Sequence, residues 1–394
     1  MMHAIRRPAH QISQQVLSRN RRPIMLAEML SPDANSFGAL RLLLALLVVV
    51  SHSYYLATGI ALASEPLHAV SGYTLGQHAV QVFFILSGVL VAQSLSRSDL
   101  LTFAAARGLR IFPALIVCVL YTALVIGPVV STLKFDAYFS SPGLAAYIRD
   151  TLLLKTGMAP LPGVFDANPA AGVVNSSVWT LKYEVACYVV LGLAGSITLH
   201  LGIARPVGLA VLAAVLAWAV VDRPALAEGN GALDQIQYFT LFFGAGVLAF
   251  AMAARLPIHW AGVMLAGAVL IATNGTRWTE VGQAVALGYT ALWLATFRFG
   301  PLRAFANRND YSYGVYIFGV PVGQTLLHLS PDLGVGGLIV MSVVISLILA
   351  VVSWSLIERP ALSLRHRVRS MASRRAAARD PVQKYAATFR QASA

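Results

Sequence analysis

The chain has 394 residues, of which 57% are hydrophobic and 11% are charged. Soluble domains carry about 25% charged residues, so this composition excludes an ordinary soluble domain and predicts an all-α polytopic membrane protein. The net charge of +13 does not indicate nucleic-acid binding, because the basic residues cluster at the chain ends and in alternate loops without interleaved aromatic residues. The two cysteines lie in apolar runs and predict neither a metal site nor a disulfide framework.

About ten apolar segments have the length that a hydrocarbon core of about 30 Å requires, and each is predicted to be a transmembrane helix. In chain order these segments cover residues 38–57, 79–96, 109–130, 179–199, 205–221, 235–254, 258–273, 281–297, 312–328 and 336–357.

Basic residues set the predicted orientation, because cytoplasmic loops carry an excess of Lys and Arg. Both termini are predicted to be cytoplasmic, which leaves few basic residues outside: Lys134, Arg149, Lys155, Arg223 and Arg277. Residues 1–35 then form a basic cytoplasmic tail, although an Arg-rich, acid-poor start is also typical of a transit peptide. Residues 361–394 form a second basic tail on the anionic inner leaflet. Residues 131–178 form one long extracytoplasmic loop, whose length favours a lid or a substrate-facing wall.

The first predicted span contains two ionisable residues, Arg41 and His52, with ten residues between them. An arginine at the centre of a membrane helix costs about 2.5–3.5 kcal/mol, which favours a functional role. A helical rise of about 1.5 Å per residue places the two residues ~16 Å apart along the axis. For His52 alone, a histidine satisfied by a neighbouring helix is an adequate explanation. A buried neutral histidine is also what a general base requires.

The second predicted span begins with His78 and Gln81 at its outer mouth, where a polar substrate is expected to bind. Further along it, Ser87 and Gly88 either belong to the site or simply permit close helix packing.

Arg107 and Arg110 lie at the inner end of the third predicted span, where they share one face of a helix. Two inside arginines are typical of a helix end in the membrane, but guanidinium groups also match phosphate oxygens in bidentate geometry. Both interpretations stay open on the spacing alone.

At the start of the fourth predicted span, Ser176 or Ser177 is explained as a helix cap and Trp179 as part of the interfacial aromatic belt. Neither explanation covers Glu184, which lies about as far inside the outer boundary as His52 does. A carboxylate–histidine pair is therefore geometrically possible.

These groups occur together and in this order, and with them the chain resembles the membrane acyltransferase-3 family, which O-acylates glycans. The matching residues are Arg41 and His52; Phe83, Phe84, Ser87 and Gly88; Arg107, Arg110 and Pro113; Ser176, Trp179, Thr180, Leu181 and Glu184; Ser312, Tyr313 and Tyr316; and Glu358, Arg359 and Pro360. One element departs from the family, because the histidine that usually follows Tyr316 is missing.

The resemblance covers residues 36–360 and implies a stand-alone transmembrane acyltransferase domain in the bacterial inner membrane. It implies acyl-CoA, most often acetyl-CoA, as the donor, and an extracytoplasmic or lipid-linked glycan hydroxyl as the acceptor, with no metal. Arg41, Arg107 and Arg110 are then expected to bind the donor phosphates. His52 is expected to act as the general base with Glu184 as its orienting carboxylate. The expected substrate-binding residues are His78, Gln81, Ser87, Trp179 and Tyr313.

Three alternatives stay open. Transfer proceeds either directly or through a transient acyl-histidine. The acceptor is either a glycan or a non-glycan molecule such as a lipid. Intramembrane His, Arg and Glu also suit a transporter or flippase, although no inverted repeat is visible. The sequence does not indicate the oligomeric state.

Overall fold

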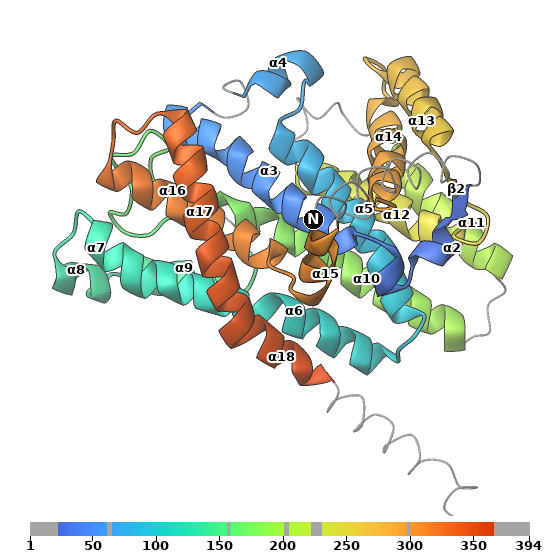
Figure 1. Cartoon of the computed structure of the whole chain (residues 1–394). Helices are drawn as coiled ribbons and strands as arrows, with labels where there is room; N and C mark the ends of the chain where they lie inside the picture. The colour runs from blue at the N-terminus through green and yellow to red at the C-terminus, as the bar shows by residue number, and fades with distance from the viewer. Residues whose placement is uncertain are drawn as a thin grey trace, which may run out of the picture. The chain divides into compact units, whose positions relative to one another are not determined.

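The computed structural model describes residues 23–60, 65–155, 158–200, 205–221, 231–297 and 300–365, and these residues are mostly helical (Figure 1). The elements in chain order are β1 (Ile24–Met25), α2 (Leu26–Met29), η2 (Pro32–Ala34), α3 (Phe37–Thr58), α4 (Pro66–Ser71), α5 (Leu75–Leu95), α6 (Leu100–Tyr121), η3 (Thr122–Ile126), α7 (Gly127–Val130), α8 (Phe135–Ser140), α9 (Pro142–Leu152), η4 (Ser176–Thr180), α10 (Leu181–His200), α11 (Arg205–Trp218), α12 (Ala232–Ala251), β2 (Pro257–Ile258), α13 (Trp260–Thr273), α14 (Thr279–Leu294), α15 (Pro301–Arg308), α16 (Ser312–Leu329), α17 (Val335–Ser353), η5 (Trp354–Glu358) and α18 (Arg359–Ser363). The predicted tails 1–35 and 361–394 lie largely outside the described residues.

Six helical segments within the described residues are long and apolar enough to cross a membrane. They are α3, α5, Leu100–Val130, Ser176–Thr198, α12 and Val335–Ser363. Each of the ten predicted spans coincides with a helix, but α11 and α13 have only 14 residues and α14 has 16. A helix of 14 residues rises about 21 Å, which is less than the hydrocarbon thickness. The span predicted at 312–328 coincides with α16, which has 18 residues but is not among the segments apolar enough to cross a membrane. Six of the ten predicted spans therefore meet these criteria.

Side-chain caps explain where several helices begin. The Thr74 hydroxyl accepts a hydrogen bond from the Gln77 amide, and the Gln77 side chain accepts one from the Thr74 amide, a capping box that starts α5. Asp99 caps α6 through the Thr102 amide. At the start of the fourth predicted span the cap is Asn175, and the serines that follow it do not have this role.

Two π-helical turns, η3 and η5, each lie just before a proline, Pro128 and Pro360 respectively. Proline lacks an amide hydrogen, and its ring clashes with the carbonyl four residues earlier, so it disturbs a regular α-helix, although α6 and α16 continue through Pro113 and Pro321 without a π-helical turn. A wider turn accommodates the proline without ending the helix. The second of these turns ends at Glu358, whose carboxylate pairs with Arg110.

The described residues form two compact units. Unit 1 comprises those within Met1–Leu40, Gln81–Leu90 and Leu209–Asn307, and unit 2 comprises those within Arg41–Val80, Val91–Gly208 and Arg308–Ala394. The predicted spans that contain Arg107, Arg110 and Glu184 belong to unit 2, as does α3 from Arg41 onward.

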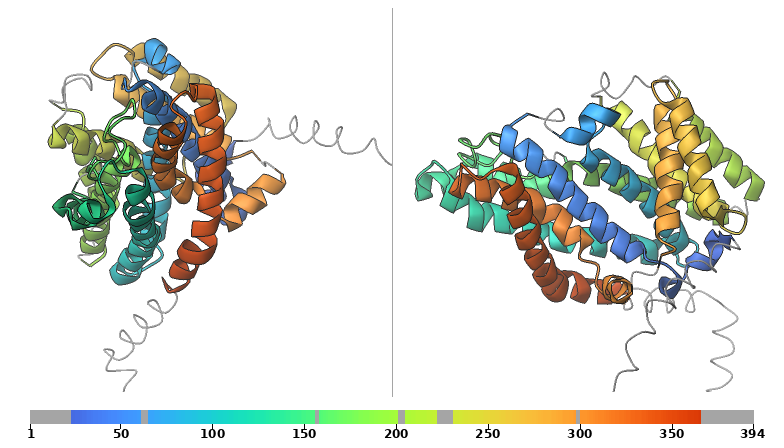
Figure 2. Two further views of the ribbon diagram at one scale, coloured as in Figure 1. Left: turned by 90° about the vertical axis from the view of Figure 1, so that its left-hand side faces the viewer. Right: turned by 45° about the horizontal axis from the view of Figure 1, so that its top comes forward.

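In unit 1, β1 pairs with β2 in an antiparallel register that places Ile24 opposite Ile258. Helices α13 and α14 lie side by side, as all views show (Figures 1 and 2). The middle of α5 packs on α12 at two glycines. A Cβ atom on Gly88 would lie 2.1 Å from the Phe243 carbonyl oxygen, and one on Gly246 would lie 2.0 Å from that of Ile85. Close packing therefore explains Gly88.

Gly88→Ala is expected to destabilise the protein by about 1–3 kcal/mol, because the new alanine Cβ meets a backbone atom that no side-chain movement can displace. Gly108→Ala is the matched control, since a Cβ on this helical glycine meets nothing within 4 Å. Alanine at an unhindered helix position stabilises by about 0.5–1 kcal/mol. Thermal unfolding in detergent checks the pair, and an equal midpoint for the two variants would contradict the packing account.

Unit 2 is built around α16, where almost every residue is buried. Its glycines let neighbouring helices approach closely. A Cβ on Gly319 would lie 2.7 Å from the Val49 side chain of α3, and one on Gly314 would lie 2.8 Å from Ala350 of α17. Figures 1 and 2 show α16 and α17 running side by side. This packing holds α3, which carries Arg41 and His52, against the centre of the unit.

Residues 131–178, predicted as one long loop, contain α8 and α9 and pack against the rest of unit 2, to which they belong. The Tyr138 hydroxyl donates to the Ala123 carbonyl at 2.6 Å. The Asn168 amide donates to the Gln324 side-chain oxygen at 2.7 Å, and the Gln324 amide donates to the Val173 carbonyl at 2.6 Å. The segment is therefore a packed part of the unit, and its role as a lid or wall stays a prediction.

Candidate functional site

Four charged side chains of unit 2 meet at one place, although they are far apart in the sequence. Arg41 Nη1 and Arg110 Nη2 lie 2.7 and 2.8 Å from the same oxygen, Asp310 Oδ2. Arg110 Nη1 lies 3.0 Å from Glu358 Oε2. The cluster thus joins α3, α6, the α15–α16 linker and η5, and its two positive and two negative charges balance.

Neutral partners complete this cluster. Ser312 donates to Asp310 Oδ1 at 2.5 Å, and Ser353 donates to Glu358 Oε1 at 3.0 Å. Burial acts to raise the pKa of Asp310, but Arg110 and Arg41 outweigh burial and hold that pKa at about 2. Asp310 is therefore ionised at neutral pH and acts as a permanent counter-ion.

Arg110 also lies over an aromatic ring that the sequence assigned to substrate binding. Its Cζ atom is 5.3 Å from the centroid of Tyr313, a cation–π distance. The Tyr313 hydroxyl donates to the Ile111 carbonyl of α6 at 2.9 Å. Tyr313 is buried, and within unit 2 these two contacts support Arg110.

Arg107 has different neighbours from Arg110. Within the part of the chain that the structure describes it forms no salt bridge, and its Nε atom is buried without a hydrogen-bond partner. Its Cζ atom lies 5.8 Å from the Tyr188 ring centroid, and the Tyr188 hydroxyl donates to Glu184 Oε1. Of the three arginines expected to bind phosphate, Arg107 is therefore the one whose charge no carboxylate neutralises directly.

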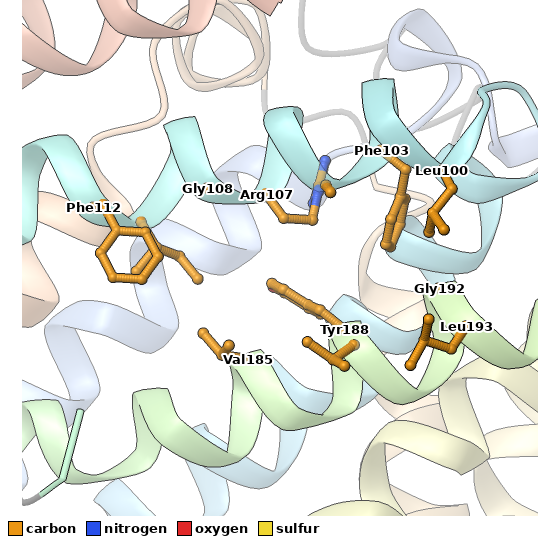
Figure 3. Close-up of a pocket in the computed structure, with 12 residues that line it drawn as sticks. Leu100, Phe103, Arg107, Gly108, Phe112, Val185, Tyr188, Gly192 and Leu193 are labelled. Carbon is orange, nitrogen blue, oxygen red and sulfur yellow. The ribbon is translucent and has the colours of Figure 1, made fainter. Parts of the chain in front are cut away.

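The Arg107 stem lines a groove of about 340 Å³ between α6 and α10. Figure 3 shows Phe103 and Phe112 of α6 and Tyr188 and Leu193 of α10 on the two sides of this groove. The lining is almost entirely apolar. It offers hydrocarbon contacts and few polar groups.

His52 lies on α3, about three turns beyond Arg41, and is half-buried. Among the described residues its imidazole makes no hydrogen bond or ion pair. Among the described residues His52 therefore forms no hydrogen bond or ion pair with Glu184, and Glu184 Oε1 accepts from Tyr188 on its own helix. The roles of His52 and Glu184 in catalysis stay predictions.

The expected substrate-binding residues are divided between the two units. Gln81 and Ser87 belong to unit 1, where the Gln81 amide donates to Tyr238 and Gln283 at 2.8 Å each. His78 and Trp179 belong to unit 2. His78 Nε2 lies 3.3 Å from the Ser71 hydroxyl, and Trp179 contacts the Tyr183 ring edge-on.

Two serines of η4, which precedes α10, have buried hydroxyls. The Ser176 and Ser177 hydroxyls have no hydrogen bond within the described residues. A buried unsatisfied hydroxyl costs about 1–3 kcal/mol, so each such group calls for an explanation in a folded protein. The hydroxyl of Ser176, which the family motif contains, is thus available to a water or a ligand.

Sequence reasoning missed the partners of the arginines. Asp310 was not singled out, and Glu358 was noted only as part of the closing Glu-Arg-Pro element. A signal was present, because both are acidic residues next to predicted spans in a chain with only 16 Asp and Glu. The pairing itself required the tertiary structure.

Among the described residues, a mostly helical structure with six segments long and apolar enough to cross a membrane is typical of a multi-pass membrane protein, and two of its arginines and two of its carboxylates form one charged cluster. The model of the acyltransferase-3 family, described as an acyltransferase domain, matches residues 35–358. The chain therefore belongs to the acyltransferase-3 family, which confirms the resemblance inferred from the motifs. This membership supports acyl transfer rather than transport.

Two relatives are similar over most of their length. An O-acetyl transferase of Shigella phage Sf6 is 29% identical over 335 residues, which are 83% of this chain and 95% of the relative. Nodulation protein 10 of Rhizobium leguminosarum bv. viciae is 28% identical over 362 residues, 85% of this chain and 95% of the relative. No solved structure matches the chain.

Proposed function

We propose that this protein transfers an acyl group, acetyl in the first instance, from cytoplasmic acyl-CoA to a hydroxyl of an extracytoplasmic or lipid-linked glycan. It acts as a multi-pass protein of the bacterial inner membrane with both termini in the cytoplasm. The similarity to an O-acetyl transferase supports the acetyl group and the oxygen acceptor. A glycan is the acceptor that family membership favours.

The observation that carries the proposal is the arrangement along α3. Arg41 joins the arginine cluster, and His52 lies eleven residues further along the same helix. That separation is ~16 Å, comparable to the extended pantetheine arm of CoA. A donor whose phosphates bind beside Arg41, at the arginines of α6, would therefore present its thioester near His52.

Arg107 is the principal phosphate contact in this proposal, because Arg41 and Arg110 are already paired with carboxylates. A guanidinium group without a counter-ion gains most from an anionic ligand. Arg41 and Arg110 add positive potential, and Asp310 keeps them in place.

His52 acts as the general base on the acceptor hydroxyl. The oxygen attacks the thioester carbonyl, a C–O bond forms, and the C–S bond breaks. The proton taken by His52 passes to the departing CoA thiolate, which restores the neutral imidazole. In the relay variant, His52 itself carries the acyl group before the sugar oxygen attacks.

Arg107→Ala is expected to remove most of the thermal stabilisation that CoA gives the purified protein. A ligand at 100 times its Kd stabilises by about 2.7 kcal/mol, and a tenfold weaker Kd removes about half of this. Thermal unfolding with and without CoA measures the effect.

Arg149→Ala is the matched control, because Arg149 is an exposed arginine that pairs with the neighbouring Asp150. This control is expected to keep the full CoA response. An unchanged CoA response in Arg107→Ala would show that Arg107 does not bind the donor.

A further inference from the structure

A buried carboxylate, Glu65, lies where α3, α4 and α5 meet in unit 2. It is only 5% exposed, and its two oxygens contact two different helices. Oε2 accepts from the Ser51 hydroxyl of α3, and Oε1 accepts from the Leu75 amide at the first turn of α5. The backbone of Glu65 also accepts from the His68 amide of α4.

The two helices touch at this point. A Cβ on Gly76 of α5 would lie 2.8 Å from the Ser51 hydroxyl oxygen and 3.0 Å from the Ser51 Cβ. The capping box of Thr74 and Gln77 fixes the same end of α5. A carboxylate also suits the positive end of a helix dipole, so Glu65 is held at α5 by both charge and geometry.

Ser51 directly precedes His52, whose imidazole has no hydrogen-bond partner among the described residues. A catalytic base is usually oriented by a third group, as in the Ser-His-Asp triad. Glu184 does not contact His52, so the position of the imidazole depends on the backbone of α3. Whatever fixes α3 at Ser51 therefore fixes His52.

We infer that Glu65 is a positioning residue for His52, which it holds in place by binding Ser51 of α3 to the first turn of α5. This inference rests on the proposed role of His52 as the base. Glu65 acts through Ser51 and the helix backbone, and both of its oxygens are already engaged by these two partners.

Three single variants test the inference in the full-length protein with labelled acetyl-CoA and envelope glycan. Glu65→Ala is expected to lower kcat by about 10–100-fold, since a misplacement of about 1 Å costs on the order of 10²-fold. Ser51→Ala is expected to give a smaller loss. Glu65→Gln is expected to keep most activity. Its side-chain oxygen can still accept from the Leu75 backbone amide, and its side-chain NH2 can donate to the Ser51 hydroxyl. The KM for acetyl-CoA and the thermal response to CoA are expected to stay within about twofold, because the arginine cluster is intact.

Ser53→Ala is the matched control. Ser53 follows His52 directly and is also buried, but within the described residues its hydroxyl donates only to the Val49 carbonyl of its own helix. Its turnover is expected to be unchanged. The double variant Ser51→Ala/Glu65→Ala is expected to lose no more than Glu65→Ala alone, because the two residues act as a unit.

Several outcomes would overturn the inference. One is a turnover of Ser51→Ala equal to that of Ser53→Ala. Another is a double variant whose fold-loss in kcat is the product of the two single losses. The third is a Glu65→Gln variant as slow as Glu65→Ala. If Glu65→Ala does not fold, Ser51→Ala and Glu65→Gln decide. His52→Ala is assayed in parallel: full activity there would refute the proposed base itself, whereas an inactive His52→Ala with an unaffected Ser51→Ala would refute only the role of Glu65.

Discussion

His52→Ala is expected to abolish acyl transfer while the protein still inserts and folds. A positioned general base contributes typically 10²–10⁴-fold to the rate, and the relay variant loses its acyl carrier altogether. Donor binding is expected to persist, because the arginine cluster lies more than two turns away along α3. Initial rates of acyl transfer and the thermal response to CoA, measured on one preparation, check both parts.

His328→Ala is the matched control for this result. His328 lies on α16 of the same unit, where its ring contacts Phe165, and it has no proposed role in transfer. It is expected to retain the wild-type rate. Normal acylation by a correctly folded His52→Ala variant would contradict the account, whichever of the two transfer routes operates.

Arg110→Ala is expected to destabilise unit 2 strongly. Glu358 is 2% exposed in its side chain, and Arg110 is its ion-pair partner in the described structure. Removing one partner of a buried pair costs about 3–5 kcal/mol, because the other charge is left without compensation. The unfolding midpoint in detergent is expected to fall well below that of Arg107→Ala, which breaks no salt bridge.

A second variant distinguishes the cost of the uncompensated charge from the cost of the lost packing. Arg110→Ala/Glu358→Gln removes the stranded charge, so it is expected to recover part of the stability that Arg110→Ala loses. The Ser353 hydroxyl remains a hydrogen-bond partner for the new amide. If Arg110→Ala unfolds at the wild-type midpoint, the cluster does not stabilise the unit in the way described.

Much of the helical architecture could be predicted from the sequence. Long apolar runs such as 38–57 predict helices, because a helix makes all of its backbone hydrogen bonds within one segment when it crosses a bilayer. The helix α3 confirms the helix predicted at 38–57. Helix starts were less predictable. Asn175, rather than Ser176 or Ser177, caps the fourth predicted span, because several cap-forming residues are adjacent in the sequence.

The site was predicted in part. Placing Arg41 and His52 on one helix needed only the periodicity of α3. The pairing of Arg41 and Arg110 with Asp310 joins residues more than 190 positions apart, and no local pattern encodes such a contact. The π-helical turn before Pro360 also changes which way Glu358 faces, which a regular helical projection does not predict.

The predicted contact between Glu184 and His52 illustrates the limit of depth arguments. Equal depth in the membrane places two residues on one plane, but side-chain contact also requires adjacent helix faces. In the structure a nearer donor, Tyr188, occupies a Glu184 oxygen from one turn away. Local partners at i and i+4 often take precedence over longer-range ones in this way.

The central claim is that acyl-CoA is the donor and a glycan hydroxyl is the acceptor. Purified protein is incubated with acetyl-CoA labelled in its acetyl group, with and without crude envelope glycan, and both free CoA and labelled glycan are measured. The account predicts that CoA release depends on the glycan and that label accumulates in it, with neither seen for His52→Ala. Wild-type protein that releases no CoA with glycan present, or that leaves the glycan unlabelled, would contradict it.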